Sequence, residues 1–146
     1  MNTQDFTTTI LVNQSPKKAF NAIRNVRGWW TENLEGRSQK LNDEFTVRFW
    51  DVHVSTQKLV EVIEGGRVVW LVTNSNLNFI DDKQEWNNTR IIFEITKQEN
   101  QTEIKFTHVG LGECYNACSN AWGDYINNSL RSLIVTGKGK PTQREV

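Results

Sequence analysis

His108 is the side chain in this sequence best suited to acid–base chemistry, because imidazole titrates near neutral pH. It follows Ile104 and Phe106 at intervals of two, so on a strand all three side chains share one face. If that face is buried, His108 lies near the strand end and could hold a ligand polar group or transfer a proton. We favour a histidine that is hydrogen-bonded at the rim of a cavity. His53 lies at a predicted strand end or turn and has no evident partner.

Cys114 and Cys118 are spaced one helical turn apart, which suits a pair of metal ligands. Structural zinc needs four ligands and catalytic zinc three plus an open position, and the sequence offers no convincing further ligand. The N-terminal residues have neither the basic start nor the apolar block of a secretory signal, so we expect a cytoplasmic protein. We therefore predict free thiols that pack as small apolar side chains, with no metal and no cofactor.

Large aromatic side chains are the candidates for lining a ligand cavity, since the chain contains six Trp and seven Phe. The hydroxyls of Tyr115 and Tyr125 fall on the apolar face of a predicted helix, where a ligand or a cavity water could satisfy them. A filled aromatic core is the alternative, and periodicity does not separate the two. The candidate cavity residues are Trp30, Phe49, Trp70, Phe93, Phe106, His108, Tyr115, Cys118, Trp122, Tyr125 and Ile126.

The composition limits the classes of partner. The 17 basic and 17 acidic residues balance. A nucleic-acid-binding protein would usually show a basic excess or a basic stripe, and because neither appears we expect no nucleic-acid partner. No run of residues approaches the roughly 18 apolar positions that a membrane span needs. With 146 residues and no repeat, low-complexity segment or linker, we expect a single domain over residues 1–146.

The element that must position these side chains is a helix predicted over 114–136. Its apolar residues recur at steps of three and four, and Gly137 and Gly139 end the pattern. A helix of this length spans about 34 Å, the width of about seven strands. It could therefore lie across a whole sheet. The apolar stripe consists of Tyr115, Cys118, Trp122, Tyr125, Ile126, Ser129, Leu130 and Leu133.

The rest of the chain reads as one strand, one or two short helices and five or six further strands. Ser15 and Pro16 are typical of a helix start, and this helix runs to about Asn25. Trp29 and Trp30 are adjacent, so a helical turn cannot bury both on the same face. The predicted strands cover 6–12, 45–49, 58–63, 67–73, 91–95 and 104–108, with a long polar loop over 74–88 that could hold a short strand.

This order is similar to the helix-grip fold of the START-like (SRPBCC) superfamily, in particular the branch related to the activator of heat-shock protein 90 ATPase. The resemblance covers nearly the whole chain and rests on motifs in sequence order. They are Ser15-Pro16, Trp29-Trp30, Lys58 to Ile63, Thr102 to His108 followed by Gly110-Leu111, and Trp122. The resemblance implies an α+β fold: a curved antiparallel sheet wrapped around a long C-terminal helix.

Pockets between such layers are common sites for small ligands. We therefore expect a binding protein for a small hydrophobic or amphipathic molecule, lipid-like or aromatic, held between the sheet and the C-terminal helix. The resemblance implies two alternatives: a chaperone-accessory protein with a protein partner, and a cavity enzyme of the cyclase or dehydratase type. No shared catalytic motif is available to carry over, so we assign no catalytic residue and favour binding over catalysis.

Overall fold

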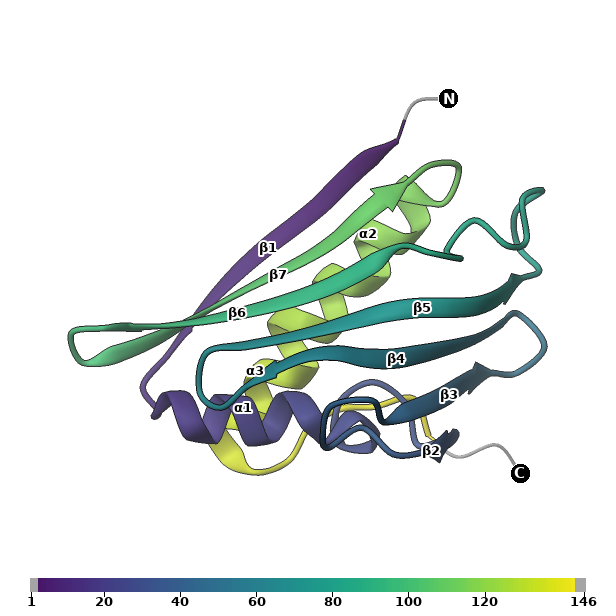
Figure 1. Ribbon diagram of the computed structural model, residues 1–146. Helices are drawn as coiled ribbons and strands as arrows, with labels where there is room; N and C mark the ends of the chain where they lie inside the picture. The colour runs from purple at the N-terminus through teal and green to yellow at the C-terminus, as the bar shows by residue number, and fades with distance from the viewer. Residues whose placement is uncertain (1–2, 144–146) are drawn as a thin grey trace.

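The protein is an antiparallel sheet with a long C-terminal helix lying across one face (Figure 1). The structure, a computed structural model, describes residues 3–143. Within them, seven strands pair in the order β1-β7-β6-β5-β4-β3-β2, so β1 lies beside the last strand of the chain. This confirms the predicted α+β helix-grip architecture. The strands are β1 (Gln4–Val12), β2 (Leu34–Gly36), β3 (Glu44–Phe49), β4 (His53–Ile63), β5 (Arg67–Leu77), β6 (Arg90–Gln98) and β7 (Gln101–Leu111).

The short helix α1 (Pro16–Arg24) forms where the sequence predicts it. The Ser15 hydroxyl accepts a hydrogen bond from the Lys18 backbone N–H at 3.1 Å, so the first turn is capped. Proline at the first helical position has its φ already near the helical value. The helix buries an apolar face that includes Phe20, which anchors it against the core.

The C-terminal helix is a continuous run of α2 (Tyr115–Asp124), η2 (Tyr125–Leu130) and α3 (Arg131–Thr136). It ends at Gly137, whose φ of 87° lies in the left-handed region that glycine adopts without strain. Figure 1 shows the helix crossing behind the strands of the sheet. Neither this helix nor any other in residues 3–143 is long and apolar enough to cross a membrane.

The middle segment η2 is π-helical, which the sequence pattern did not predict. The buried stripe of the helix runs through Cys118, Trp122, Ile126, Leu130 and Ile134 at a constant spacing of four. Such a stripe drifts around an α-helix of 3.6 residues per turn. The wider π turn corrects the drift and keeps the stripe facing the sheet.

Strands β4 and β5 are longer than predicted. β4 begins at His53 instead of Lys58, and β5 ends at Leu77 instead of Thr73. The added residues that face inward are partly polar, and Ser55 of β4 pairs with a serine of β5. Polar residues on the buried face remove the apolar alternation from which strands are predicted. The first part of the predicted polar loop is therefore strand.

The adjacent Trp29 and Trp30 are both buried in the same core. The short 3-10 helix η1 (Val26–Gly28) ends before them, and Trp29 leaves helical geometry with φ −138° and ψ −25°. Their rings stack with centroids 6.2 Å apart. The expectation that a helical turn separates them therefore does not apply, because the backbone is not helical at this point. The residues that follow form the short strand β2, which the sequence did not predict.

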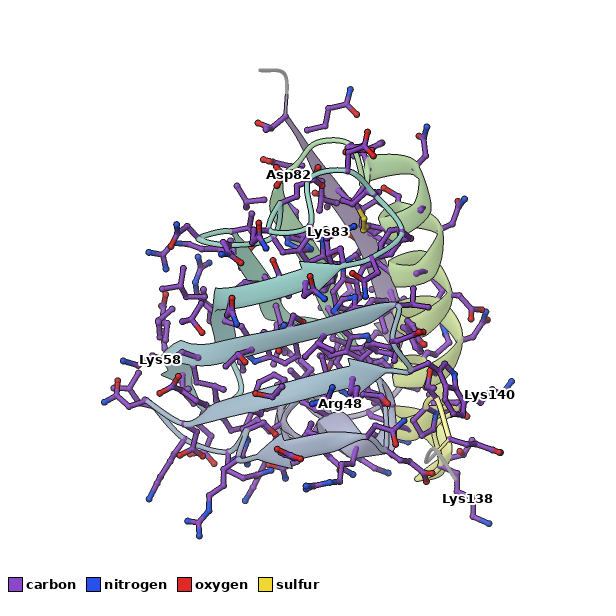
Figure 2. All side chains as sticks on the ribbon, turned by 90° about the vertical axis from the view of Figure 1, so that its right-hand side faces the viewer. Arg48, Lys58, Asp82, Lys83, Lys138 and Lys140 are labelled. Atoms are coloured by element: carbon purple, nitrogen blue, oxygen red, sulfur yellow. A yellow bond between two sulfur atoms is a disulfide. The ribbon has the colours of Figure 1, made fainter. Side chains whose placement is uncertain are left out.

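Stacked rings fill much of the space between the sheet and the helix. The Trp70 ring stacks on Trp29 at 6.3 Å and on Trp30 at 5.9 Å, and Trp122 meets Trp30 at 4.8 Å. Figure 2 shows side chains occupying the space between the two layers, with Lys58 pointing away from the sheet on the opposite side. This part of the interior is a packed aromatic core.

Candidate functional site

A pocket opens where α2 meets the β3–β4 turn and the loop between β5 and β6. Its cavity volume is about 190 Å³. Ala117 and Ala121 of the helix have short side chains, which leave this space open. Val52 and Phe79 are 45% and 42% exposed and stand at its mouth. The lining residues, called the aromatic pocket below, are Trp30, Phe49, Val52, His53, Phe79, Trp86, Ala117, Cys118, Ala121, Trp122 and Tyr125.

Trp86 joins the walls of the aromatic pocket to one another. Although it comes from the loop, its side chain is only 3% exposed. Its ring stacks on Trp122 at 5.9 Å and on Trp30 at 6.4 Å, and its centroid lies 4.6 Å from that of His53 in an edge-to-face contact. Because these contacts tie the loop to the helix and to β4, the wall is rigid rather than a free loop.

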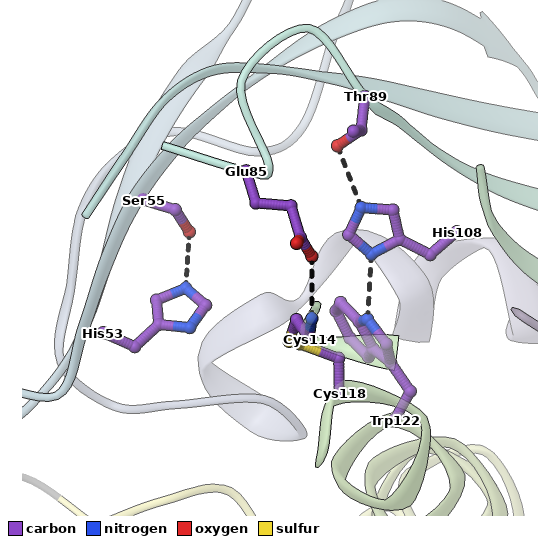
Figure 3. Close-up of a disulfide and its surroundings, with 8 residues drawn as sticks. All are labelled: His53, Ser55, Glu85, Thr89, His108, Cys114, Cys118 and Trp122. Atoms are coloured by element: carbon purple, nitrogen blue, oxygen red, sulfur yellow. Dashed lines mark hydrogen bonds between the residues drawn. A yellow bond between two sulfur atoms is a disulfide. The ribbon is translucent and has the colours of Figure 1, made fainter. Parts of the chain in front are cut away.

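His108 lies behind Trp122 and has no exposed surface. Trp122 donates its indole N–H to His108 Nδ1 at 3.0 Å, so Nδ1 carries no proton and the neutral ring is protonated at Nε2. Nε2 then donates to Thr89 Oγ1 at 2.9 Å (Figure 3). That hydroxyl donates to the Trp86 carbonyl at 2.6 Å. In this relay, which joins Trp122, His108, Thr89 and the Trp86 carbonyl, the Trp122 indole N–H, both His108 nitrogens and the Thr89 hydroxyl are all paired.

The His108 relay favours the neutral imidazole. Burial, together with a smaller contribution from the nearby His53, lowers the pKa of His108 to about 3. Protonation would add a hydrogen at Nδ1, directly opposite the indole N–H of Trp122. His108 therefore holds the core together and is not placed at the cavity rim or available for proton transfer near neutral pH.

His53 lies on the wall of the aromatic pocket, at the start of β4. Its Nε2 lies 2.7 Å from Ser55 Oγ, which also accepts from Gln57 Nε2 at 2.6 Å. Burial lowers the pKa of His53 to about 3. The three polar residues occur at intervals of two along one strand face, and that spacing is the sequence signal that could have linked His53 to partners.

The two tyrosines are placed differently. The Tyr125 hydroxyl lies 2.5 Å from Thr142 Oγ1, so the protein itself satisfies it. Burial raises the pKa of Tyr125, although the Thr142 hydrogen bond opposes this shift. Thr142 also donates its backbone N–H to the Trp30 carbonyl at 3.0 Å, which ties the C-terminal segment over one wall of the pocket. Tyr115 is partly buried and does not line the pocket.

The sequence candidates divide between the pocket and the core. Trp30, Phe49, Cys118, Trp122 and Tyr125 line the aromatic pocket. The structure places Trp70, Phe93, Phe106 and Ile126 in the packed core, fully buried. Sequence reasoning missed Val52, His53, Phe79, Trp86, Ala117 and Ala121, which come from loop residues, a strand start and small helix residues.

Cys114 and Cys118 form a disulfide, with Cα atoms 5.4 Å apart. Our expectation of free thiols was wrong, because one turn at the helix start brings the two Cα atoms within the range of about 4.4–6.8 Å that a disulfide spans. Glu85 accepts a hydrogen bond from the Cys114 backbone N–H at 3.0 Å and ties the loop to this corner (Figure 3). Over residues 3–143, no group of three or more His, Cys, Asp or Glu side chains is placed to hold a metal ion.

Three polar atoms in and beside the aromatic pocket are shut off from solvent and have no hydrogen-bond partner among the described residues. They are Gln57 Oε1, Trp70 Nε1 and Trp86 Nε1. Buried polar groups in native proteins are normally paired with protein or ordered water. The hydrogen bonding of buried polar groups is therefore incomplete at this end of the interior.

Comparison with known proteins supports the fold. No family model matches the sequence, and no curated protein matches it either. The solved structure of the Aha1 dimer from Colwellia psychrerythraea matches with a TM-score of 0.76 and 23% identity, over 93% of this chain and 99% of that one. Protein MLL2253 from Mesorhizobium loti matches at 0.72 and 12%, over 90% and 96% of the two chains. DynU16, from the dynemicin biosynthetic locus, matches at 0.68 and 14%, over 96% of this chain and 51% of that one. At this identity the likeness shows a shared helix-grip fold.

Proposed function

We propose that this protein binds a small, flat, apolar or aromatic molecule in the aromatic pocket. The observation that carries the proposal is a cavity of about 190 Å³ that is walled by aromatic rings and whose exposed lining residues are Val52, Phe79, Ala117 and Ala121. Concave sites lined mostly by apolar and aromatic side chains, with few polar groups, are typical of small-molecule binding.

The volume of the aromatic pocket narrows the choice between the two ligand classes expected from the sequence, lipid-like and aromatic molecules. An engineered apolar cavity of about 150 Å³ accommodates benzene. A cavity of about 190 Å³ therefore fits one substituted ring or two small fused rings. A fatty acid or an isoprenoid chain would have to extend out of the mouth, so flat aromatic molecules fit best.

Thermal unfolding with small aromatic probes tests the proposal. Toluene or acetophenone that binds only the folded state stabilises it by about 2.7 kcal/mol at one hundred times its dissociation constant. This raises the melting temperature by several degrees for a domain of this size. Trp30, Trp86 and Trp122 line the pocket, so tryptophan emission should change with the same midpoint.

A pocket-filling variant separates binding in the pocket from adhesion elsewhere. Ala121→Leu places a larger side chain in the cavity and should abolish both signals, while Asn120→Leu on the exposed side of the same helix should leave them intact. If neither probe changes the melting temperature or the emission of the parent protein, or if Ala121→Leu binds as the parent does, the proposal fails.

A second candidate function is docking of a protein partner at the mouth of the pocket. Three apolar side chains at this mouth are about half exposed: Trp50, Val52 and Phe79. The two segments that carry them are joined by a hydrogen bond from the Asn78 N–H to the Val52 carbonyl at 2.8 Å. Exposed apolar groups gathered in this way are typical of interaction sites. The resemblance of the sequence motifs to the family of the activator of heat-shock protein 90 ATPase implies a chaperone as the partner.

Purified heat-shock protein 90 tests this second candidate directly. Its ATPase rate should change in the presence of this protein, and the change should be lost in the Val52→Ser, Phe79→Ser double variant. Leu41→Ser, which alters an exposed apolar residue elsewhere, is the matched control. An unchanged ATPase rate at saturating protein would remove the chaperone candidate.

A further inference from the structure

The wall of the aromatic pocket carries two strongly buried side chains whose hydrogen bonding is incomplete, Trp86 and His53. His53 is 8% exposed, and its Nε2 is bonded to Ser55. Its other nitrogen, Nδ1, has no hydrogen-bond partner among residues 3–143. Among the other polar groups of the lining, Trp122 donates to His108 and the Tyr125 hydroxyl is bonded to Thr142, whereas the Trp86 indole N–H is a second unpaired donor.

The partners of Ser55 determine where the proton of His53 lies. Ser55 Oγ accepts a hydrogen bond from Gln57 Nε2, and the acceptor within reach of its own hydroxyl hydrogen is His53 Nε2. The hydroxyl therefore donates to Nε2, because the alternative leaves a buried O–H without an acceptor. With Nε2 accepting, the neutral ring carries its proton at Nδ1. His53 thus presents an unpaired N–H donor on the pocket wall.

The charges around the pocket define the rest of the ligand. None of its lining residues is a Lys, Arg, Asp or Glu, and burial keeps His53 neutral by lowering its pKa to about 3. A charged ligand would lose its hydration without gaining a counter-charge. A neutral ligand with an acceptor such as a carbonyl oxygen keeps its ring against the tryptophans and pairs the free N–H.

We propose that the aromatic pocket selects neutral aromatic molecules bearing a hydrogen-bond acceptor, which His53 recognises through its Nδ1–H. This inference rests on the proposed function, since it assigns the polar contact of the same pocket. It makes His53 a specificity-determining residue and Ser55 a positioning residue that fixes the tautomer of the ring.

Two nearly isosteric ligands isolate that contact. Acetophenone and α-methylstyrene differ in a carbonyl oxygen against a methylene group, so only the first can accept from His53. In His53→Phe, which keeps a ring in place, the affinity for acetophenone should fall by about 2- to 12-fold, as expected for one hydrogen bond. The affinity for α-methylstyrene should not change, and titration calorimetry measures both.

The outcomes separate this inference from the proposed function. If neither compound binds the parent protein, the proposed function fails and the inference with it. If both bind and His53→Phe leaves their affinity ratio unchanged, the pocket stands and the recognition by His53 is overturned. Tighter binding of phenyltrimethylammonium than of tert-butylbenzene would also overturn it, in favour of an aromatic cage for cations.

Nitrogen-15 spectroscopy of the histidine rings tests the tautomer without any ligand or variant. The His53 ring should be protonated at Nδ1, and the His108 ring at Nε2. Protonation of His53 at Nε2 would overturn the proposal, because Nδ1 would then be an acceptor and select ligands with a donor. In Ser55→Ala the Nδ1 preference of His53 should weaken, while His108 should be unaffected.

Discussion

The two histidines of this protein lie in similar surroundings, but within residues 3–143 only one of them has hydrogen-bond partners at both ring nitrogens. Both are buried, both have a pKa lowered to about 3, and both contact Trp86 edge to face at 4.6 Å. His108 has both nitrogens paired, and the relay around it closes on a backbone carbonyl. His53 has one nitrogen paired, and its ring lies on the pocket wall. A completed hydrogen-bond network marks a structural core, whereas an incomplete one beside a cavity marks a place for a ligand.

The largest expected effect on stability comes from a substitution in the relay around His108. Trp122→Ala removes a ring that is 2% exposed and should lower the free energy of unfolding by about 3–5 kcal/mol. Trp122→Phe keeps most of the ring but takes the donor from His108 Nδ1, so it should cost about 1–3 kcal/mol. Chemical denaturation measures both. A Trp122→Ala midpoint equal to that of the parent would contradict the packing described for the C-terminal helix.

Acid should destabilise both regions. The unfolded histidines have a pKa of about 6.5 and the folded ones of about 3, so the unfolded state binds more protons between these values. Stability is therefore full above about pH 6.5 and is lost as the pH falls toward 3. Between pH 7 and pH 5 each histidine should cost about 2 kcal/mol.

Denaturation curves at several pH values, with His53→Phe as the comparison, check the acid prediction. The variant retains one buried histidine, so its stability should depend on pH about half as steeply as that of the parent over the same window. A free energy of unfolding that stays constant from pH 7 to pH 5 would show that both rings take up protons in the folded state.

The disulfide next to the pocket should have a smaller effect. It closes a loop of only one helical turn between Cys114 and Cys118, so the chain-entropy model gives about 2 kcal/mol or less. Reductant should lower the denaturation midpoint of the parent and leave that of the Cys114→Ala, Cys118→Ala double variant unchanged. An intact mass that does not rise by two hydrogens on reduction would show that the thiols are free.

The contrast between the two regions also explains what the sequence could predict. The alternation of Phe45, Val47 and Phe49 predicts β3, and Ser15 with Pro16 predicts α1, because these signals are local. The packed core follows the same periodicity, so its residues were recognised as buried. Whether a buried aromatic residue fills the core or lines a cavity depends on its neighbours in space, which is why Trp70 and Trp30 could not be told apart.

Most of the pocket wall lies where periodic signals are weak. Trp86 and Phe79 come from a loop, and loops have no repeating pattern to orient a side chain. The stripe of polar residues on β4 hides the strand start and with it the position of His53. Ala121 contributes by being small, and a small residue on a helix has no signature of a cavity. The hydrogen bonds of His108 join residues far apart in sequence, so its enclosure could not be predicted either.

The smallest predicted effect is a difference in stability between two variants, and it compares the hydrogen-bond networks around His108 and His53 most directly. Thr89→Val removes a partly buried hydroxyl that both accepts from His108 and donates to the Trp86 carbonyl, so the buried His108 ring loses one of its two partners. It should cost about 1–3 kcal/mol. Ser55→Ala removes a hydroxyl that is 1% exposed and also accepts from Gln57, but the His53 ring lines the pocket and can then pair with water there, so the substitution should cost about 0.5–1.5 kcal/mol.

The expected difference of about 1 kcal/mol between these variants therefore measures how readily water replaces the lost hydroxyl beside each histidine. Thr7→Val, which alters an exposed hydroxyl on β1 that lies 3.4 Å from the Thr107 hydroxyl, controls for the chemical change itself and should be nearly neutral. Urea denaturation at pH 7.5, where both rings are neutral, resolves differences of this size. If Ser55→Ala costs as much as Thr89→Val, the network around His53 is as closed as the relay around His108. The unpaired Nδ1 of His53 would then not mark a place for a ligand on the pocket wall.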